Sequence, residues 1–88
     1  MFEWDELKNI ENTKKHSVSF EQAVKVFDDN KFLILDDKSH SAEEERFFCI
    51  GEVNGKIMTV RFTTRGDAVR IIGAGYWRKG KKLYEKNH

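Results

Sequence analysis

The first part of the chain has the polar and apolar pattern of a surface helix. Residues 5–16 are expected to form it, because Asp5 can cap the N-terminus and acidic residues there suit the helix dipole. Leu7 and Ile10 form a narrow apolar stripe on this segment. We therefore predict that this stripe anchors the helix on the surface of the domain.

A second helix is predicted directly afterwards. Ser19 and Gln22 have the spacing of a capping box, in which each residue satisfies a free backbone amide through its side chain. The helix is expected to end near residues 28–30, a turn-forming cluster. The apolar residues that recur at helical spacing and should face the core are Phe20, Ala23, Val24 and Phe27.

The pattern then changes to that of strands. Asn54-Gly55 lies between two apolar runs and predicts a hairpin, because a type I′ turn needs positive φ at both central residues. In the strand after it, apolar and polar residues alternate, which predicts one buried and one polar face. The expected strands are residues 31–35, 46–53, 56–64 and 68–74.

These elements predict an α+β domain. Two N-terminal helices would pack on one face of an antiparallel sheet of about four strands. Residues 78–86 could add a short basic helix, which Gly80 weakens. The length of 88 residues is that of one domain, residues 1–88.

The charge is divided unevenly along the chain. Residues 1–45 have a balance of −6 and residues 46–88 one of +7, which together give the net charge of +1. The basic half favours an anionic partner such as nucleic acid, unless the two halves interleave into an ordinary surface. Cys49 is the only cysteine. We expect its side chain to be buried in the core, and we expect the protein to lie in a reducing cytoplasm. No apolar run has the length of a membrane span.

Several separated segments together carry a family resemblance. In chain order they are Phe2-x-Trp4-Asp5, Lys15-His16-x-Val18-Ser19-Phe20, His40-Ser41-x-x-Glu44-Glu45-Arg46 and Arg70-Ile71-Ile72. Over residues 2 to about 74 this combination resembles the BrnT toxin family. The resemblance implies a fold similar to the RelE ribonuclease toxins and RNA cleavage that halts translation. It also implies neutralisation by an antitoxin of the BrnA type, through which alone the protein would reach DNA.

The sequence departs from the family pattern in three places. Ser17 replaces a glycine, and Asp29-Asn30 replaces Asp-Pro. Gly73-Ala74-Gly75 stands where the family often has Ser-Ala-Arg, so an arginine expected near the RNA phosphate is missing at position 75. Arg78 could supply that charge from another backbone position. The missing arginine supports an alternative function, a non-catalytic module that binds RNA or a protein partner.

Cleavage of RNA without a metal needs a base, an acid and cations at the phosphate. Arginine suits the cationic role, because its planar fork binds two phosphate oxygens. His40 can transfer protons near neutral pH, and Glu45, with Glu44 as a weaker candidate, could act as the base. The predicted catalytic residues are His40, Glu45, Arg46, Arg65 and Arg70.

A second set mixes aromatic and basic residues, which suits stacking on single-stranded bases beside phosphate contacts. The predicted RNA-binding residues are Lys56, Arg61, Tyr76, Trp77, Arg78 and Lys79. The segment from Tyr76 to Lys79 suits two other arrangements equally well. It could form an interface with a partner protein, or it could bury an aromatic residue next to a solvated basic segment. We expect no cofactor and no metal, because no second histidine has ligand spacing. A small interaction domain unrelated to RNA is the third alternative.

Overall fold

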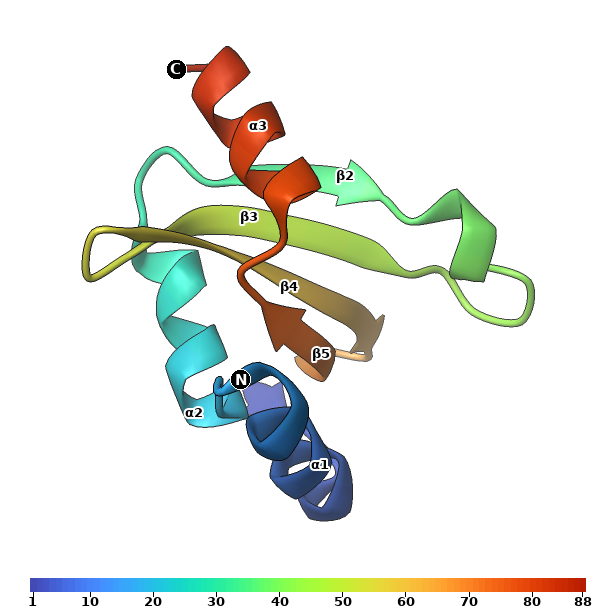
Figure 1. The fold of residues 1–88 in the computed structure, drawn as a ribbon. Helices are drawn as coiled ribbons and strands as arrows, with labels where there is room; N and C mark the ends of the chain where they lie inside the picture. The colour runs from blue at the N-terminus through green and yellow to red at the C-terminus, as the bar shows by residue number, and fades with distance from the viewer.

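A five-stranded sheet forms the centre of the molecule (Figure 1). The computed structural model describes residues 1–88. The sheet order is β1-β5-β4-β3-β2, with β1 parallel to β5 and every other pair antiparallel. The four predicted strands are confirmed, but the fully antiparallel sheet is wrong, because a two-residue β1 has no periodicity to detect. The strands are β1 (Phe2–Glu3), β2 (Leu33–Asp36), β3 (Phe47–Val53), β4 (Lys56–Arg65) and β5 (Ala68–Gly75).

The predicted hairpin joins β3 and β4. Asn54 and Gly55 have φ values of 51° and 82°, so both central residues adopt the left-handed conformation that the turn requires. The tight turn sets the register in which Cys49 is opposite Val60. This register turns every second side chain of β3 and β4 toward the N-terminal helices.

The two N-terminal helices begin where their caps predict. α1 (Glu6–His16) is capped by Asp5, whose side chain accepts a hydrogen bond from the Leu7 amide at 2.9 Å. α2 (Phe20–Ala23) begins with the complete capping box of Ser19 and Gln22. α2 lasts only four residues and continues as a 3-10 helix, η1 (Val24–Asp28).

The η1 segment approaches the sheet closely. A Cβ atom at Gly51 of β3 would lie 2.9 Å from the Val26 carbonyl oxygen, so the η1 backbone lies directly on the strand. Val26 is fully buried there. The predicted core positions Phe20 and Ala23 are also fully buried, whereas Val24 and Phe27 are partly buried at the edge of the core.

The predicted apolar anchor of α1 is wrong. Leu7 and Ile10 are 70% and 47% exposed, and the buried residues of this helix are Asn9 and Asn12. The Asn12 amide donates to the carbonyl oxygens of Val18 and Ala74, both at 2.9 Å, and its oxygen accepts from the Ala74 amide at 3.2 Å. Polar contacts to backbone groups therefore attach α1 to β5.

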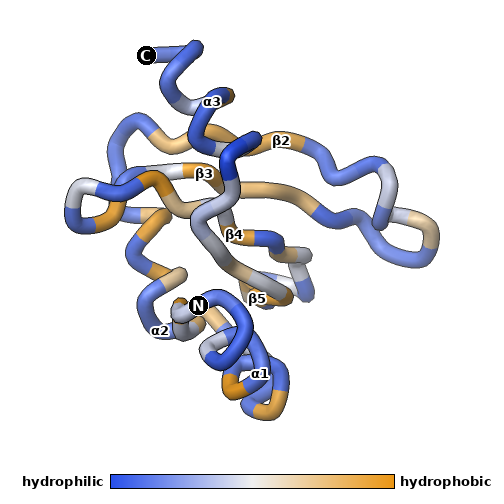
Figure 2. Tube along the Cα trace, in the orientation of Figure 1, coloured by the Kyte–Doolittle hydropathy of each residue, from blue (hydrophilic) through white to orange (hydrophobic).

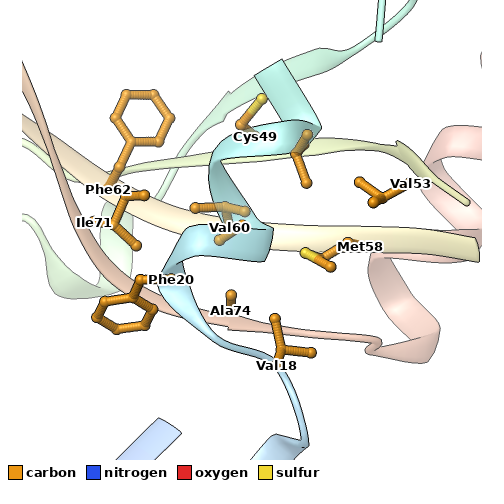
Figure 3. Packing of buried hydrophobic residues seen from close by; sticks show 11 residues of the cluster. Val18, Phe20, Cys49, Val53, Met58, Val60, Phe62, Ile71 and Ala74 are labelled. Carbon is orange, nitrogen blue, oxygen red and sulfur yellow. The ribbon is translucent and has the colours of Figure 1, made fainter. Parts of the chain in front are cut away.

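One hydrophobic cluster fills the space between the sheet and the α2–η1 segment (Figure 3). Met58, Val60 and Phe62 contribute the alternate positions of β4, as their pattern predicts. Cys49 is buried in the same cluster, and burial raises the pKa of its thiol to about 12. Cys49 is therefore a packing residue and not a nucleophile.

α3 (Arg78–Lys86) covers the opposite face of the sheet from α1 and α2 (Figure 1). The basic C-terminal helix is thus confirmed, and it lies on the face that the two N-terminal helices leave open. The helix is mostly hydrophilic (Figure 2). It rests on the sheet through Gly80, which is buried against Thr59 of β4. Thr59, expected on an open polar face, is 5% exposed beneath it. None of the helices combines the length and apolar character needed to cross a bilayer.

The end of α3 is fixed by a hydrogen bond to the segment before β2. The Tyr84 hydroxyl donates to Asp29 Oδ2 at 2.5 Å. This bond, with the Glu52 amide and others, lowers the pKa of Asp29 below its ordinary value of 3.8. The same bond and burial raise the pKa of Tyr84 to about 12. Asp29 thereby connects α3, β3 and the end of η1.

Replacing Tyr84 by phenylalanine should lower the free energy of unfolding by about 1 kcal/mol at pH 7, since a hydrogen bond to a charged, partly exposed group is lost. The native pKa of Asp29 is lowered. The contribution of this hydrogen bond to the free energy of unfolding is therefore present above pH 3.8 and is lost as the pH falls through the lowered value. The native pKa of Tyr84 is raised, so the contribution holds below pH 10.0 and is lost as the pH rises through about 12. Urea unfolding from pH 3 to 7 should show the wild-type and variant curves converging in acid.

Candidate active site

Several polar side chains share the sheet face that α3 covers only in part. Arg61 is paired with Phe48, and Arg70 with Thr63, on the face opposite the core. Asp37 follows β2, and its amide donates to the Arg46 carbonyl oxygen at 2.8 Å. This bond continues the β2–β3 pairing and brings Asp37 onto the same face.

A carboxylate and an imidazole are joined at this corner. Asp37 is 2% exposed, and His40 lies three residues later in the short 3-10 helix η2 (Lys38–His40). His40 Nδ1 is 3.0 Å from both carboxylate oxygens of Asp37, and the Ser39 hydroxyl is 3.1 Å from Oδ1. The His40 side chain remains 50% exposed. An ionised Asp37 holds the hydrogen on Nδ1, which leaves Nε2 free to accept a proton.

The electrostatics keep Asp37 ionised. Burial alone would raise the pKa of Asp37, but hydrogen bonds from His40 and Ser39 and the charges of His40 and Arg61 outweigh it, so the pKa is lowered. Asp37 is therefore a fixed negative charge behind His40 at neutral pH. The arrangement has the base and the orienting group that proton transfer requires.

The predicted arginines differ in how they are neutralised. Arg70 is bound to Glu3 at 2.9 Å, while Arg46 and Arg65 lie 3.5 and 3.8 Å from Glu44. Arg61 forms no ion pair within 4.0 Å. Its positive charge acts on Asp37 from a longer distance and helps to lower the pKa of that carboxyl group. Arg46 Nε is buried without a hydrogen-bond partner. Arg61 is therefore the least neutralised of these arginines, and an anion at Arg46 or Arg65 has to compete with Glu44.

Glu45 lies beside this corner but is not joined to it by its side chain. The residue is exposed and forms no ion pair, whereas its carbonyl oxygen accepts from the Thr63 hydroxyl at 2.6 Å. Glu44 is the carboxylate that contacts the arginines. The structure thus places His40 and Arg46 at one hollow together with Glu43 and Glu44. The Arg61 guanidinium lies over Gly73 of β5 and reaches Asp37 only through its charge, and Glu45 stays outside the hollow.

The aromatic and basic candidates form a second group near the β3–β4 hairpin. Lys56 Nζ lies 5.3 Å from the centre of the Tyr76 ring, and both line a shallow hollow with Arg78. Lys79 instead lines an apolar groove between α3 and the sheet. Trp77 lines both hollows and joins the two halves of this group.

Trp77 explains the glycine at position 75. A Cβ atom at Gly75 would lie 2.8 Å from Cζ2 of the indole, a distance that real Cβ atoms do not reach. The indole therefore occupies the space into which an arginine side chain at position 75 would extend. Arg78 lines the hollow near the hairpin.

Sequence reasoning missed two acidic residues that shape the site. Asp37 stands three residues before His40, a spacing that indicates a contact only once the 3-10 turn is known. Glu3 pairs with Arg70 across 67 positions, because β1 joins the sheet beside β5. No local pattern connects these two residues.

The fold and the site define a class of protein. A small α+β domain presents an exposed imidazole, fixed by a buried carboxylate, in one hollow with the side chain of Arg46, which suits proton transfer at an anionic group. Residues 4–80 match the model of a family described as the ribonuclease toxin, BrnT, of a type II toxin-antitoxin system. The chain belongs to this family. Among curated proteins, no match is found.

Proposed function

We propose that this protein cleaves single-stranded RNA at the corner formed by Asp37, His40, Arg46 and Arg61. The family is one of ribonuclease toxins, which makes RNA the substrate class. The observation that carries the assignment of the site is the Nδ1–carboxylate contact at 3.0 Å, which orients the exposed ring of His40. A ring fixed in this way is prepared to accept a proton without rearrangement.

The reaction we propose uses the RNA 2′-hydroxyl as nucleophile. Its proton passes to His40 Nε2, while the 2′-oxygen bonds to phosphorus and the bond from phosphorus to the 5′-oxygen breaks. The leaving 5′-oxygen takes a proton from solvent, so the products are a 2′,3′-cyclic phosphate and a 5′-hydroxyl. Arg46 and Arg61 stabilise the charge on the phosphate oxygens. No metal enters any step.

The other predicted residues receive supporting roles. Arg65 and Arg70 extend the positive surface, although RNA has to compete with Glu44 and Glu3 for them. Glu45 stays a prediction for a second proton carrier, since it lies exposed at the edge of the site. Lys56, Tyr76, Arg78 and Lys79 would bind the RNA strand outside the reacting nucleotides.

The cellular role follows from the same family. We infer that residues 1–88 act as one toxin domain in the cytoplasm, where RNA cleavage halts translation. An antitoxin of the BrnA type, a protein with its own DNA-binding domain, would neutralise it. The toxin itself would contact DNA only through that partner.

A cleavage assay with the purified chain tests the proposal. A mixed-sequence single-stranded RNA should be cut in the presence of EDTA and yield 2′,3′-cyclic phosphate ends. Intact RNA, together with normal growth of bacteria that express the chain alone, would rule out the ribonuclease activity. Binding of uncleaved RNA in that case would support the alternative, a non-catalytic binding module.

Replacing Glu44 by alanine should strengthen RNA binding by about twofold to fivefold, because exposed ion pairs of this kind contribute up to about 1 kcal/mol. The change frees Arg46 and Arg65, which lie 3.5 and 3.8 Å from Glu44. Fluorescence anisotropy with labelled RNA measures the effect, and Asp28→Ala is the matched control, since Asp28 is an exposed residue of η1 that forms no ion pair and does not line the hollow of His40 and Arg46. Equal affinities of the two variants would contradict the prediction.

A further inference from the structure

Another hollow lies on the far side of Arg61, between α1 and β5. Its cavity volume is about 280 Å³. Lys8, Lys15 and His16 line it from α1, Arg61 lines it from β4, and Trp77 lines it from the start of α3. Glu11 is the only acidic residue there, so the lining is predominantly basic.

The floor of this hollow is open. Gly73 has no side chain, and a Cβ atom there would lie 3.5 Å from Arg61 Nη2 and 3.8 Å from Asn12 Oδ1, which are ordinary contact distances. Asn12 already uses its amide and its oxygen in bonds to the backbone. A ligand in this space therefore meets the cationic groups and the aromatic rings.

The aromatic end is rigid. The rings of His16 and Trp77 meet edge to face with centroids 5.2 Å apart, and Gly75 lets the indole lie against the strand. A preorganised indole beside cationic side chains is the combination that stacks an unpaired base and holds its phosphate. Only two of the nine lining residues are hydrophobic, so an apolar anchor of a protein partner would bury little area here.

We propose that this hollow binds the nucleotide next to the scissile one on a single-stranded RNA. Lys8, Lys15 and Arg61 hold its phosphate, and its base stacks on Trp77. Arg61 lies between the hollow and Asp37, so an RNA strand that crosses Arg61 occupies both places. This inference rests on the proposed function, because it takes RNA as the ligand.

The test measures binding without cleavage. The probe is a mixed-sequence oligoribonucleotide of about eight nucleotides, within the usual site size. It is 2′-O-methylated throughout, so its 2′-oxygens cannot attack. Lys15→Ala should weaken its binding to the full chain by about threefold to tenfold and reduce the slope of log affinity against log salt by about 0.7. Lys14→Ala, the neighbouring lysine, does not line the hollow and should leave affinity and slope close to wild type.

A change without charge tests the space itself. Gly73→Val should fill the hollow and press on the Arg61 guanidinium, which would lie 3.5 Å from the added Cβ atom, so we expect binding to weaken by about threefold to tenfold. Circular dichroism verifies that the Gly73→Val variant folds. If this variant does not fold, the binding measured for Lys15→Ala decides whether the hollow binds RNA.

Three results separate the possibilities. Equal affinities for the Lys15 and Lys14 variants would overturn the proposal. If Gly73→Val binds RNA normally but no longer binds the antitoxin, the hollow belongs to the protein partner. This result would also overturn the proposal. Cleavage of unmodified RNA by wild-type protein is scored separately, so a failure of this hollow and a failure of the ribonuclease function are distinguishable.

Discussion

Replacing His40 by alanine is expected to lower the rate of RNA cleavage by about 10²–10⁴-fold, the usual contribution of a positioned acid–base group. His40 is held by Asp37 at 3.0 Å and is half-exposed, so its loss removes the base without removing packing. Single-turnover cleavage of an unmodified RNA measures the rate. The affinity for the 2′-O-methylated RNA should stay within about twofold, because the phosphate contacts remain.

Asp37→Asn separates positioning from catalysis. An asparagine amide can donate to Nδ1 and so favour the tautomer with its hydrogen on Nε2, which is the wrong one for a base. We expect a loss of kcat of about 10²-fold or more with little change in KM. His88→Ala is the matched control, since His88 contacts Tyr84 and Lys31 far from Asp37. Full activity of folded His40→Ala would remove this residue from the mechanism.

The fold was predictable where a local signal decides the structure. Asp5 and Ser19 cap their helices, and Asn54-Gly55 forms the hairpin, because each preference acts within four residues. The face of α1 was not predictable by counting apolar positions. Asn12 is buried because Ala74, 62 residues away, presents backbone groups that its side chain pairs with.

The site was predictable in its residue types and less so in its partners. The sequence points to His40, Arg46 and Arg61, and the fold brings them onto one side. The acidic partners follow from long-range pairing, as in the contact of Arg70 with Glu3. The surface of the sheet is consequently less positive than the count of arginines suggests, and Arg61 is its least neutralised member.

Replacing Gly80 by alanine should lower the free energy of unfolding by about 2–3 kcal/mol, a typical cost of overpacking. Helix propensity alone gives the opposite sign, since alanine in a helix interior is favoured over glycine by about 1 kcal/mol. A Cβ atom at Gly80 would lie 2.0 Å from Thr59 Oγ1 and 3.3 Å from Thr59 Cβ, so α3 has to move away from β4. Urea unfolding at pH 7 measures the change.

Thr59 offers a partner change that identifies the cause. Its Oγ1 is buried without a hydrogen-bond partner, so Thr59→Ala loses no hydrogen bond. In the double variant with Gly80→Ala, the 2.0 Å contact is gone, and the 3.3 Å contact to Thr59 Cβ remains with an ordinary contact of 3.7 Å to Ile50 Cδ1. We therefore expect the double variant to recover about 1–2 kcal/mol relative to additivity, within the range for residues in contact. Additive effects, or a Gly80→Ala variant more stable than wild type, would show that α3 does not rest on β4 through this glycine.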